Sequence, residues 1–266
     1  LDLGTASVIA YVKGKGIVLR EPSVVAVNNL TGEVLAVGHE ARRMLGRTPG
    51  NIVALRPLKD GVISDYTITE KMLKYFINKV CGKFVFAPKI MICVPSRVTE
   101  VERKAVIDAA SHAGARKVYL IEEPMAAAIG AKLKVEQPEG TMIVDIGGGT
   151  SEMAVISYGD PIVSESVRVA GDAFDDAIAA QIRKKHGVIV GARTAEEIKM
   201  SIGSAYPLES MRNISTDVRG RSAANGQPVT VSVSADDVRD ALMVPLKSVF
   251  EAIHRVLEQT PPELSA

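Results

Sequence analysis

The sequence has few cysteines, few aromatic residues and almost no net charge. It contains two cysteines, no tryptophan and only 4% aromatic residues. Because Cys81 and Cys93 stand alone, without a CxxC motif or clustered histidines, a disulfide framework and a zinc site are both disfavoured. Unpaired cysteines suit a reducing compartment, and we therefore expect a cytoplasmic protein.

Charge and hydropathy argue against two further classes of protein. Lysine and arginine (32) balance aspartate and glutamate (31), so there is no basic surplus of the kind that nucleic-acid binding requires. No apolar run reaches the roughly 20 residues of a transmembrane helix, and the first residues lack a signal-peptide pattern. With 266 residues, 47% of them apolar, the chain should be globular, with one or two domains and no nucleic-acid partner.

The first third of the chain shows strand patterns followed by a helix pattern. Apolar runs at 8–12, 16–19 and 23–27 are separated by glycine, proline and asparagine, which predicts an antiparallel meander. Apolar residues then recur at helical spacing over 65–81, with Asp65 as the expected N-cap.

The rest of the chain alternates between the two patterns. The apolar run at 90–94, bounded by prolines, predicts a central parallel strand covered on both faces. Thr99 and Glu102 fit a capping box at the start of the next helix, and Pro245 should kink or divide a long helix over 235–259. Further strands are expected at 117–121, 141–146, 152–157, 162–169, 214–218 and 229–233, and further helices at 172–186 and 194–203. This alternation predicts an α/β fold.

An internal repeat is the most informative pattern. The residues Asp-Leu-Gly-Thr at 2–5 match Asp-Ile-Gly-Gly at 145–148 in type and in context. Each copy ends one strand-like run and is followed by another strand, not by a helix. The sequence therefore predicts two related halves.

The repeated turns are suited to binding phosphate. A glycine-rich turn between strands exposes successive backbone N–H groups and lets an anion approach closely. The residues that supply this geometry and nearby hydroxyl donors are Gly4, Thr5, Ser7, Gly147, Gly148, Gly149, Thr150 and Ser151. Asp2 and Asp145 precede the turns and could hold hydrated Mg²⁺ through water. The alternative is a pair of tight hairpins with glycine at positive φ. No GxxxxGK[ST] motif is present and no helix follows the glycines, which disfavours P-loop and dinucleotide-binding folds.

A series of longer motifs gives the sequence a family resemblance. These are DLGTAS at 2–7, GKGIVL at 14–19, EPSVVAV at 21–27, DGVISDY at 60–66, IEEPMAAAIGA at 121–131, VDIGGGTSE at 144–152, RVAGDAFDDAI at 168–178, RTAEEIKMSIG at 193–203 and TPPEL at 260–264. Together they resemble the MreB family of bacterial actins, in the actin/heat-shock-chaperone ATPase superfamily, over essentially the whole chain.

The resemblance implies an actin-like α/β fold of two ribonuclease-H-like lobes, each with a small inserted subdomain and with an ATP cleft between them. It places the first lobe at 1–145 with an insertion at about 28–64, and the second at 146–266 with an insertion at about 182–236. The chain starts at Leu1 inside a strand-like run and stops before the family's third glycine-rich motif. We therefore expect a fragment whose second lobe is incomplete.

The resemblance also implies roles for individual residues. Glu123 would orient the attacking water, with Thr150 as its partner near the γ-phosphate; the alternative for Glu123 is a carboxylate favoured by the start of a helix. The implied nucleotide contacts are Gly4, Thr5, Ala6, Ser7, Gly147, Gly148, Gly149, Thr150, Gly171, Asp172, Glu196, Glu197 and Lys199. An exposed ion pair is the alternative for Glu196 and Lys199. Phe84, Val85 and Phe86 match a membrane-insertion loop, with core packing as the alternative.

The implied function is that of a slow, Mg²⁺-dependent ATPase that polymerises into paired filaments at the inner face of the cytoplasmic membrane. Such filaments organise cell-wall synthesis and maintain rod shape. The implied partners are the protein itself, the membrane, the wall-elongation machinery and a transmembrane adaptor such as RodZ. A non-hydrolysing nucleotide-binding scaffold, a small-molecule kinase and a chaperone ATPase of the same fold are the alternatives.

Overall fold

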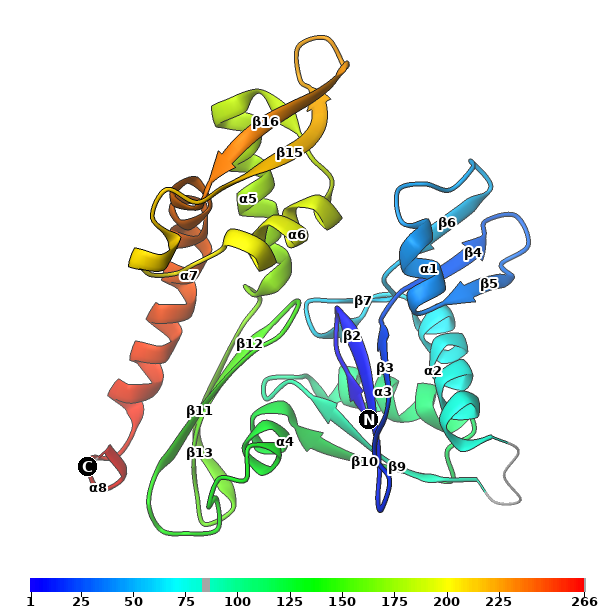
Figure 1. The fold of residues 1–266 in the computed structure, drawn as a ribbon. Helices are drawn as coiled ribbons and strands as arrows, with labels where there is room; N and C mark the ends of the chain where they lie inside the picture. Colours follow the sequence, from blue (N-terminus) through cyan, green and yellow to red (C-terminus); the bar gives the residue numbers. More distant parts are fainter. Residues whose placement is uncertain (83–86, 266) are drawn as a thin grey trace. The chain divides into compact units, whose positions relative to one another are not determined.

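A computed structural model describes residues 1–82 and 87–265 (Figure 1). The chain forms two compact units, which we describe separately: Leu1–Arg168 with Arg255–Ala266, and Val169–His254. The predicted lobes and inserted subdomains stay a prediction, because compactness alone does not define them. Among the helices of the described residues, none is both long enough and apolar enough to cross a membrane.

The first unit begins with an antiparallel meander and a second small sheet. The meander contains β1 (Asp2–Leu3), β2 (Ser7–Val12) and β3 (Gly16–Pro22), and the small sheet contains β4 (Val25–Asn28), β5 (Val34–Val37) and β6 (Ile52–Leu55) in the order β5-β4-β6. The prediction that 23–27 completes the first meander is therefore wrong. Ser23 donates its N–H to the Ala6 carbonyl at 3.0 Å and its hydroxyl to the Gly4 carbonyl at 2.5 Å. These bonds fix the chain at the first glycine-rich turn, and the helix α1 (His39–Met44) packs Ala41 against the small sheet beyond it.

A parallel pair of strands extends the first meander. β9 (Lys89–Val94) and β10 (Lys117–Glu122) pair in parallel along their whole length, as predicted for 90–94. Leu1 donates its amino group to the Met91 carbonyl at 2.6 Å and accepts the Cys93 N–H at 3.0 Å, which joins β1 to β9. The predicted burial on both faces is wrong, because Ile92 is buried whereas Met91 is 51% exposed.

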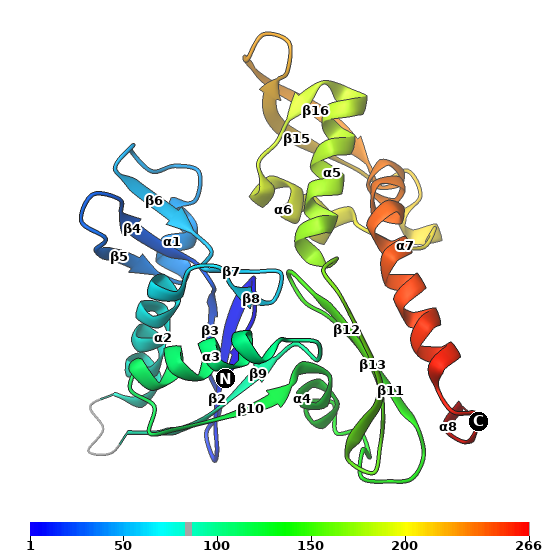
Figure 2. The same cartoon turned by 180° about the vertical axis from the view of Figure 1, so that it is seen from behind.

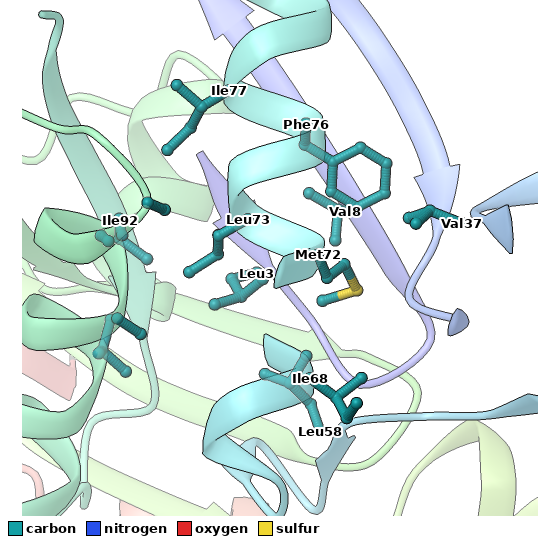
Figure 3. Packing of buried hydrophobic residues seen from close by; sticks show 14 of the residues in the cluster. Leu3, Val8, Val37, Leu58, Ile68, Met72, Leu73, Phe76, Ile77 and Ile92 are labelled. Carbon is teal, nitrogen blue, oxygen red and sulfur yellow. The ribbon is translucent and has the colours of Figure 1, made fainter. Parts of the chain in front are cut away.

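Two capped helices pack against these strands in one hydrophobic core. In α2 (Tyr66–Cys81), Asp65 Oδ1 accepts the Ile68 N–H at 2.9 Å, which confirms the predicted N-cap. The helix packs Met72, Leu73 and Phe76 against residues of the strands such as Leu3, Val8 and Ile92 (Figure 3). Each fully buried side chain of this size contributes about 1.5–3 kcal/mol. In α3 (Glu100–His112), which connects β9 to β10, the capping box of Thr99 and Glu102 is confirmed.

The first unit ends with a second meander. β11 (Thr141–Ile146), β12 (Ser151–Ser157) and β13 (Asp160–Val167) pair antiparallel in that order, and α4 (Glu123–Gly130) connects β10 to this meander. Ala128 of α4 packs against Ala154 and Ile156 of β12. A short hairpin, β7 (Leu58–Lys59) with β8 (Val62–Ile63), lies between β6 and α2 in the sequence.

The second unit combines helices with a small antiparallel sheet. It contains α5 (Gly171–His186), β14 (Val188–Ile189), α6 (Ala192–Ile202), a 3₁₀ turn (Glu209–Met211), β15 (Ser215–Ser222) and β16 (Pro228–Ser234). α5 packs beside α6 (Figure 2), and the core includes Ile178, Ile198, Val218 and Val238. The helix α7 (Ala235–Gln259) begins here and runs on through Pro245, so the helix is not divided there, and the kink that was predicted as the other possibility stays a prediction. The last residues of α7 and the short helix α8 (Pro262–Ser265) belong to the first unit.

Candidate functional site

The two glycine-rich turns have the same backbone geometry. Between β1 and β2, the Gly4 N–H donates to the Ser7 carbonyl at 3.0 Å. Between β11 and β12, the Gly147 N–H donates to the Thr150 carbonyl at 2.9 Å. Each turn closes an antiparallel hairpin, so the internal repeat predicted from the sequence is confirmed as a repeated structure.

The glycines of the second turn are required by a close approach of chain segments. Gly147, Gly148 and Gly149 all lie outside the left-handed region, so the alternative of glycine at positive φ does not apply. A methyl group added to Gly148 would lie 2.5 Å from Ala6 Cβ, and one added to Gly149 would lie 2.6 Å from Thr5 Oγ1. The two turns therefore face each other at a distance that leaves no room for a side chain at these positions.

The hairpin β7–β8 contacts both turns. Its two-residue loop, Asp60-Gly61, has φ values of 52° and 77°, as a type I′ turn requires. The Gly61 N–H donates to Thr5 Oγ1 at 2.9 Å, and a methyl group added to Gly61 would lie 2.9 Å from Thr150 Cγ2. Thr5 and Thr150 are consequently only 5% and 7% exposed. No hairpin was predicted at this loop from the sequence, although Asp-Gly between short strands is a strong hairpin signal.

Carboxyl groups gather beside the two turns. Burial, followed by the charge of Asp145, raises the pKa of Asp2, and burial raises the pKa of Asp145. Burial, followed by the charges of Glu152, Asp2 and Asp145, raises the pKa of Glu123 to about 8. A hydrated divalent cation would offset this repulsion, so Asp2 and Asp145 fit Mg²⁺ held through water. Across residues 1–82 and 87–265, no three potential metal ligands converge for direct coordination.

A buried hydrogen-bond network around Glu152 was not predicted from the sequence. This residue is 1% exposed, and its Oε2 accepts the Ser96 N–H at 3.1 Å and the Ser96 hydroxyl at 2.5 Å. Its Oε1 accepts the Ser166 hydroxyl at 2.5 Å. The signal for Glu152 was available, because it is the one charged residue in the apolar run 151–157. Nothing in the local sequence marks the two serines.

Four of the predicted nucleotide contacts lie together in the second unit. Lys199 Nζ lies 2.8 Å from Asp175 Oδ1 and donates to the Gly171 carbonyl at 3.0 Å, which ties α6 to the start of α5. Burial is the main cause of the raised pKa of Asp175, and the charges of Glu196 and Asp172 add to it. The structure therefore brings Gly171, Asp172, Glu196 and Lys199 into one neighbourhood.

The other predicted contacts are placed differently. Glu197 pairs with Arg193 at 2.9 Å on the surface of α6, with its side chain 61% exposed. Phe84, Val85 and Phe86, the predicted membrane loop, lie outside the described residues.

Comparison with known proteins identifies the family. A family profile described as "MreB/Mbl protein" matches residues 1–266. The cell shape-determining protein Mbl of Bacillus subtilis (strain 168) is 52% identical over 100% of this chain and 80% of its own length. The cell shape-determining protein MreB of Escherichia coli (strain K12) is 51% identical over 100% of this chain and 78% of its own length.

Solved structures agree with this assignment. MreB5 of Spiroplasma citri bound to ADP is 40% identical, with a TM-score of 0.94 over 100% of this chain and 79% of its own. The MamK double helical filament is 22% identical, with a TM-score of 0.79 over 100% of this chain and 81% of its own, and shows the fold alone. The predicted actin-like fold is thus confirmed. The chain belongs to the MreB/Mbl family, whose relatives named above determine cell shape.

Proposed function

We propose that this protein is a polymerising bacterial actin that binds ATP and forms filaments at the inner face of the cytoplasmic membrane, where they organise cell-wall synthesis and maintain rod shape. The pairing of two equivalent glycine-rich turns, with Asp2 and Asp145 before them, carries the proposal. It is supported by the solved complexes of MreB5 of Spiroplasma citri with ADP and with AMPPNP. Family relatives that determine cell shape, and a fold shared with a filament, support the cytoskeletal role.

The two turns would hold the phosphates of the nucleotide. Exposed backbone N–H groups and threonine hydroxyls are donors that suit phosphate oxygens, and the close approach of Gly148 to Ala6 brings the donors of both turns together. Mg²⁺, when bound, supplies positive charge that neutralises the phosphate oxygens. Asp2 and Asp145 would hold its water ligands, since burial raises the pKa of both carboxyl groups and a nearby cation would favour their charged forms.

Glu123 and Thr150 would carry out hydrolysis. Glu123 is the first residue of α4, directly beyond β10, and its carboxyl interacts with those of Asp2 and Asp145. From this position it can orient a water molecule toward a phosphate, a role that depends on positioning more than on covalent chemistry. Thr150 ends the second turn and would align the same water.

The remaining contacts complete the proposal. Glu196 and Lys199 would contact the ribose and the adenine, and the nucleotide would also contact Gly171, Asp172 and Glu197. The loop Phe84-Val85-Phe86 would insert into the membrane, and the small apolar area of one loop would require many copies along a filament for firm attachment. Wall-elongation proteins and a transmembrane adaptor such as RodZ would be the cellular partners.

Sedimentation of the full-length protein tests the proposal. Wild type, Glu123→Gln and the exposed control Glu136→Gln are compared with ATP, ADP or no nucleotide, with Mg²⁺, and with or without vesicles containing phosphatidylglycerol. We expect pelleting that requires ATP, more pelleting with vesicles, and phosphate release that is lost only in Glu123→Gln. A protein that neither binds ATP nor pellets under any condition would contradict the proposal.

A non-hydrolysing scaffold is the second candidate. The raised pKa of Glu123 favours it, because a protonated carboxyl cannot accept a proton from water. In this case ATP would bind and promote pelleting, while phosphate release would be absent in the wild type and unchanged in Glu123→Gln.

A further inference from the structure

Glu152 is a charged side chain in a strand whose residues are all buried. In the register of the second hairpin it lies directly opposite Asp145, and the equivalent position in the first hairpin, opposite Asp2, is Ile9. The two repeated hairpins therefore differ at this position, where one has an apolar side chain and the other a carboxylate. Like charges opposite each other in a hairpin are destabilising, so Glu152 needs compensation from elsewhere.

The compensation comes from three hydrogen-bond donors. The N–H and hydroxyl of Ser96 donate to one carboxylate oxygen, and the hydroxyl of Ser166 donates to the other. Both oxygens are thus engaged by hydrogen-bond donors. If one set of these donors were lost, a buried carboxyl oxygen would be left without a partner, which is destabilising; the three contacts therefore depend on one another.

The network links the parts of the unit that carry Glu123 and Thr150. Ser96 follows β9, whose last residue, Val94, pairs with Glu122, the residue directly before Glu123. Glu152 lies on β12, which begins directly after Thr150. After burial, the charge of Glu152 is the next cause of the raised pKa of Glu123.

We propose that Glu152 is a positioning residue for hydrolysis: through Ser96 and Ser166 it fixes the spacing between Glu123 and the turn that ends at Thr150. The proposal rests on the ATPase activity proposed above. Without Glu152 the two parts would remain folded but would lose their alignment, and a misplacement of about 1 Å can lower a rate by roughly a hundredfold.

The same contact region contains a matched control. Glu165 on β13 is also buried, at 9% exposure, and pairs with Arg97 at 2.6 Å and with Arg255 at 3.2 Å. Arg97 follows Ser96 directly, so Glu165 holds the same loop to the second meander. Its ion pairs are with Arg97 and Arg255 and not with either glycine-rich turn, so its loss should affect stability and not alignment.

The test compares kcat, KM for ATP and Tm in the full-length protein. We expect Glu152→Gln and Ser96→Ala each to lower kcat by about tenfold or more while KM changes less than about twofold. In the double variant the two effects should not add, because both changes disrupt one network. Glu165→Gln should lower Tm while kcat stays within about twofold of wild type.

Each of the other outcomes has a distinct meaning. If Glu152→Gln lowers Tm as much as Glu165→Gln does and leaves kcat unchanged, Glu152 is structural and the inference is wrong. If Glu152→Gln does not fold, Ser96→Ala and Ser166→Ala decide the question in the same way. A wild type that binds but does not hydrolyse ATP refutes the proposed ATPase, and the positioning role with it.

Discussion

Gly148 has no room for a side chain, and this requirement can be tested directly. The change Gly148→Ala places a methyl group 2.5 Å from Ala6 Cβ and 3.1 Å from its nitrogen, so the two turns must separate. Overpacking of this kind costs about 1–3 kcal/mol, and we expect the affinity for ATP to fall by about tenfold or more. Isothermal titration calorimetry measures the affinity.

Gly130 provides the control for this substitution. It lies in α4, and a methyl group added there would meet no atom within 4 Å. Gly130→Ala should bind ATP as the wild type does and be slightly more stable, because alanine favours helix by about 1 kcal/mol. If Gly148→Ala and wild type bound ATP with equal affinity, binding of the phosphates would not depend on the close approach of the two turns.

The ionisation of Glu123 should make the nucleotide-free protein less stable as the pH rises. Burial, followed by the charge of Glu152, raises its pKa from 4.5 to about 8 in the folded state. Between these values the unfolded chain releases the proton and the folded protein retains it, so stability falls from about pH 4.5 to about pH 8 and is constant above. Glu123→Gln removes this loss.

Thermal unfolding at pH 5 and pH 8 measures the effect. The Tm of Glu123→Gln minus the Tm of wild type should be at least about 3 °C larger at pH 8 than at pH 5. A change of roughly 1 kcal/mol in stability shifts Tm by this amount in a protein of this size. The exposed control Glu136→Gln should show no such change. A difference in Tm that does not vary with pH would argue against the raised pKa.

Residues of the site differ in how far the sequence can predict them. The sequence predicted the two turns that contain Asp2, Gly4, Asp145 and Gly147, because a turn is a local structure and its repetition is visible in the chain. Ser96 could not be found, since its role depends on Glu152, which lies far from it in the sequence and meets it only in the folded unit.

At the scale of single elements, the capping box of α3 should contribute to stability. Thr99 Oγ1 accepts the Glu102 N–H at 3.3 Å, and Glu102 Oε2 accepts the Thr99 N–H at 2.7 Å. Thr99→Ala removes one of these bonds, and we expect a loss of about 1 kcal/mol in the free energy of unfolding. Urea denaturation measures it, with Thr31→Ala in an exposed loop as the control. A loss no larger than that of the control would mean that α3 is held by packing alone.

Elements with local signals were predicted well, and those that depend on pairing were not. α2 and α3 begin where Asp65 and Thr99 cap them, because capping involves residues three apart. The strand β4 was assigned to the wrong sheet, since its apolar pattern does not say which neighbour it pairs with. Likewise Pro245 does not divide α7, because a proline can be accommodated where the surrounding helix is held by its packing.

At the scale of the whole molecule, ligands of different size should protect different parts of the chain. The proposed phosphate contacts, at 4–7 and 147–150, belong to the first unit, and the proposed nucleoside contacts around Lys199 belong to the second. Tripolyphosphate with Mg²⁺ should therefore slow hydrogen exchange only at the two turns and the hairpin β7–β8. ATP with Mg²⁺ should slow it there and also at the start of α5 and in α6.

A substitution separates the two sets of contacts. Glu196→Ala should leave the protection by tripolyphosphate unchanged and should weaken the protection that ATP gives to α6. Ligand at a hundred times its Kd stabilises the bound state by about 2.7 kcal/mol, which is enough to slow exchange roughly a hundredfold at amides whose local opening requires the ligand to leave. If ATP protects the first unit alone, the residues around Lys199 do not contact the nucleoside, and their ion pair serves only to hold α6 against α5.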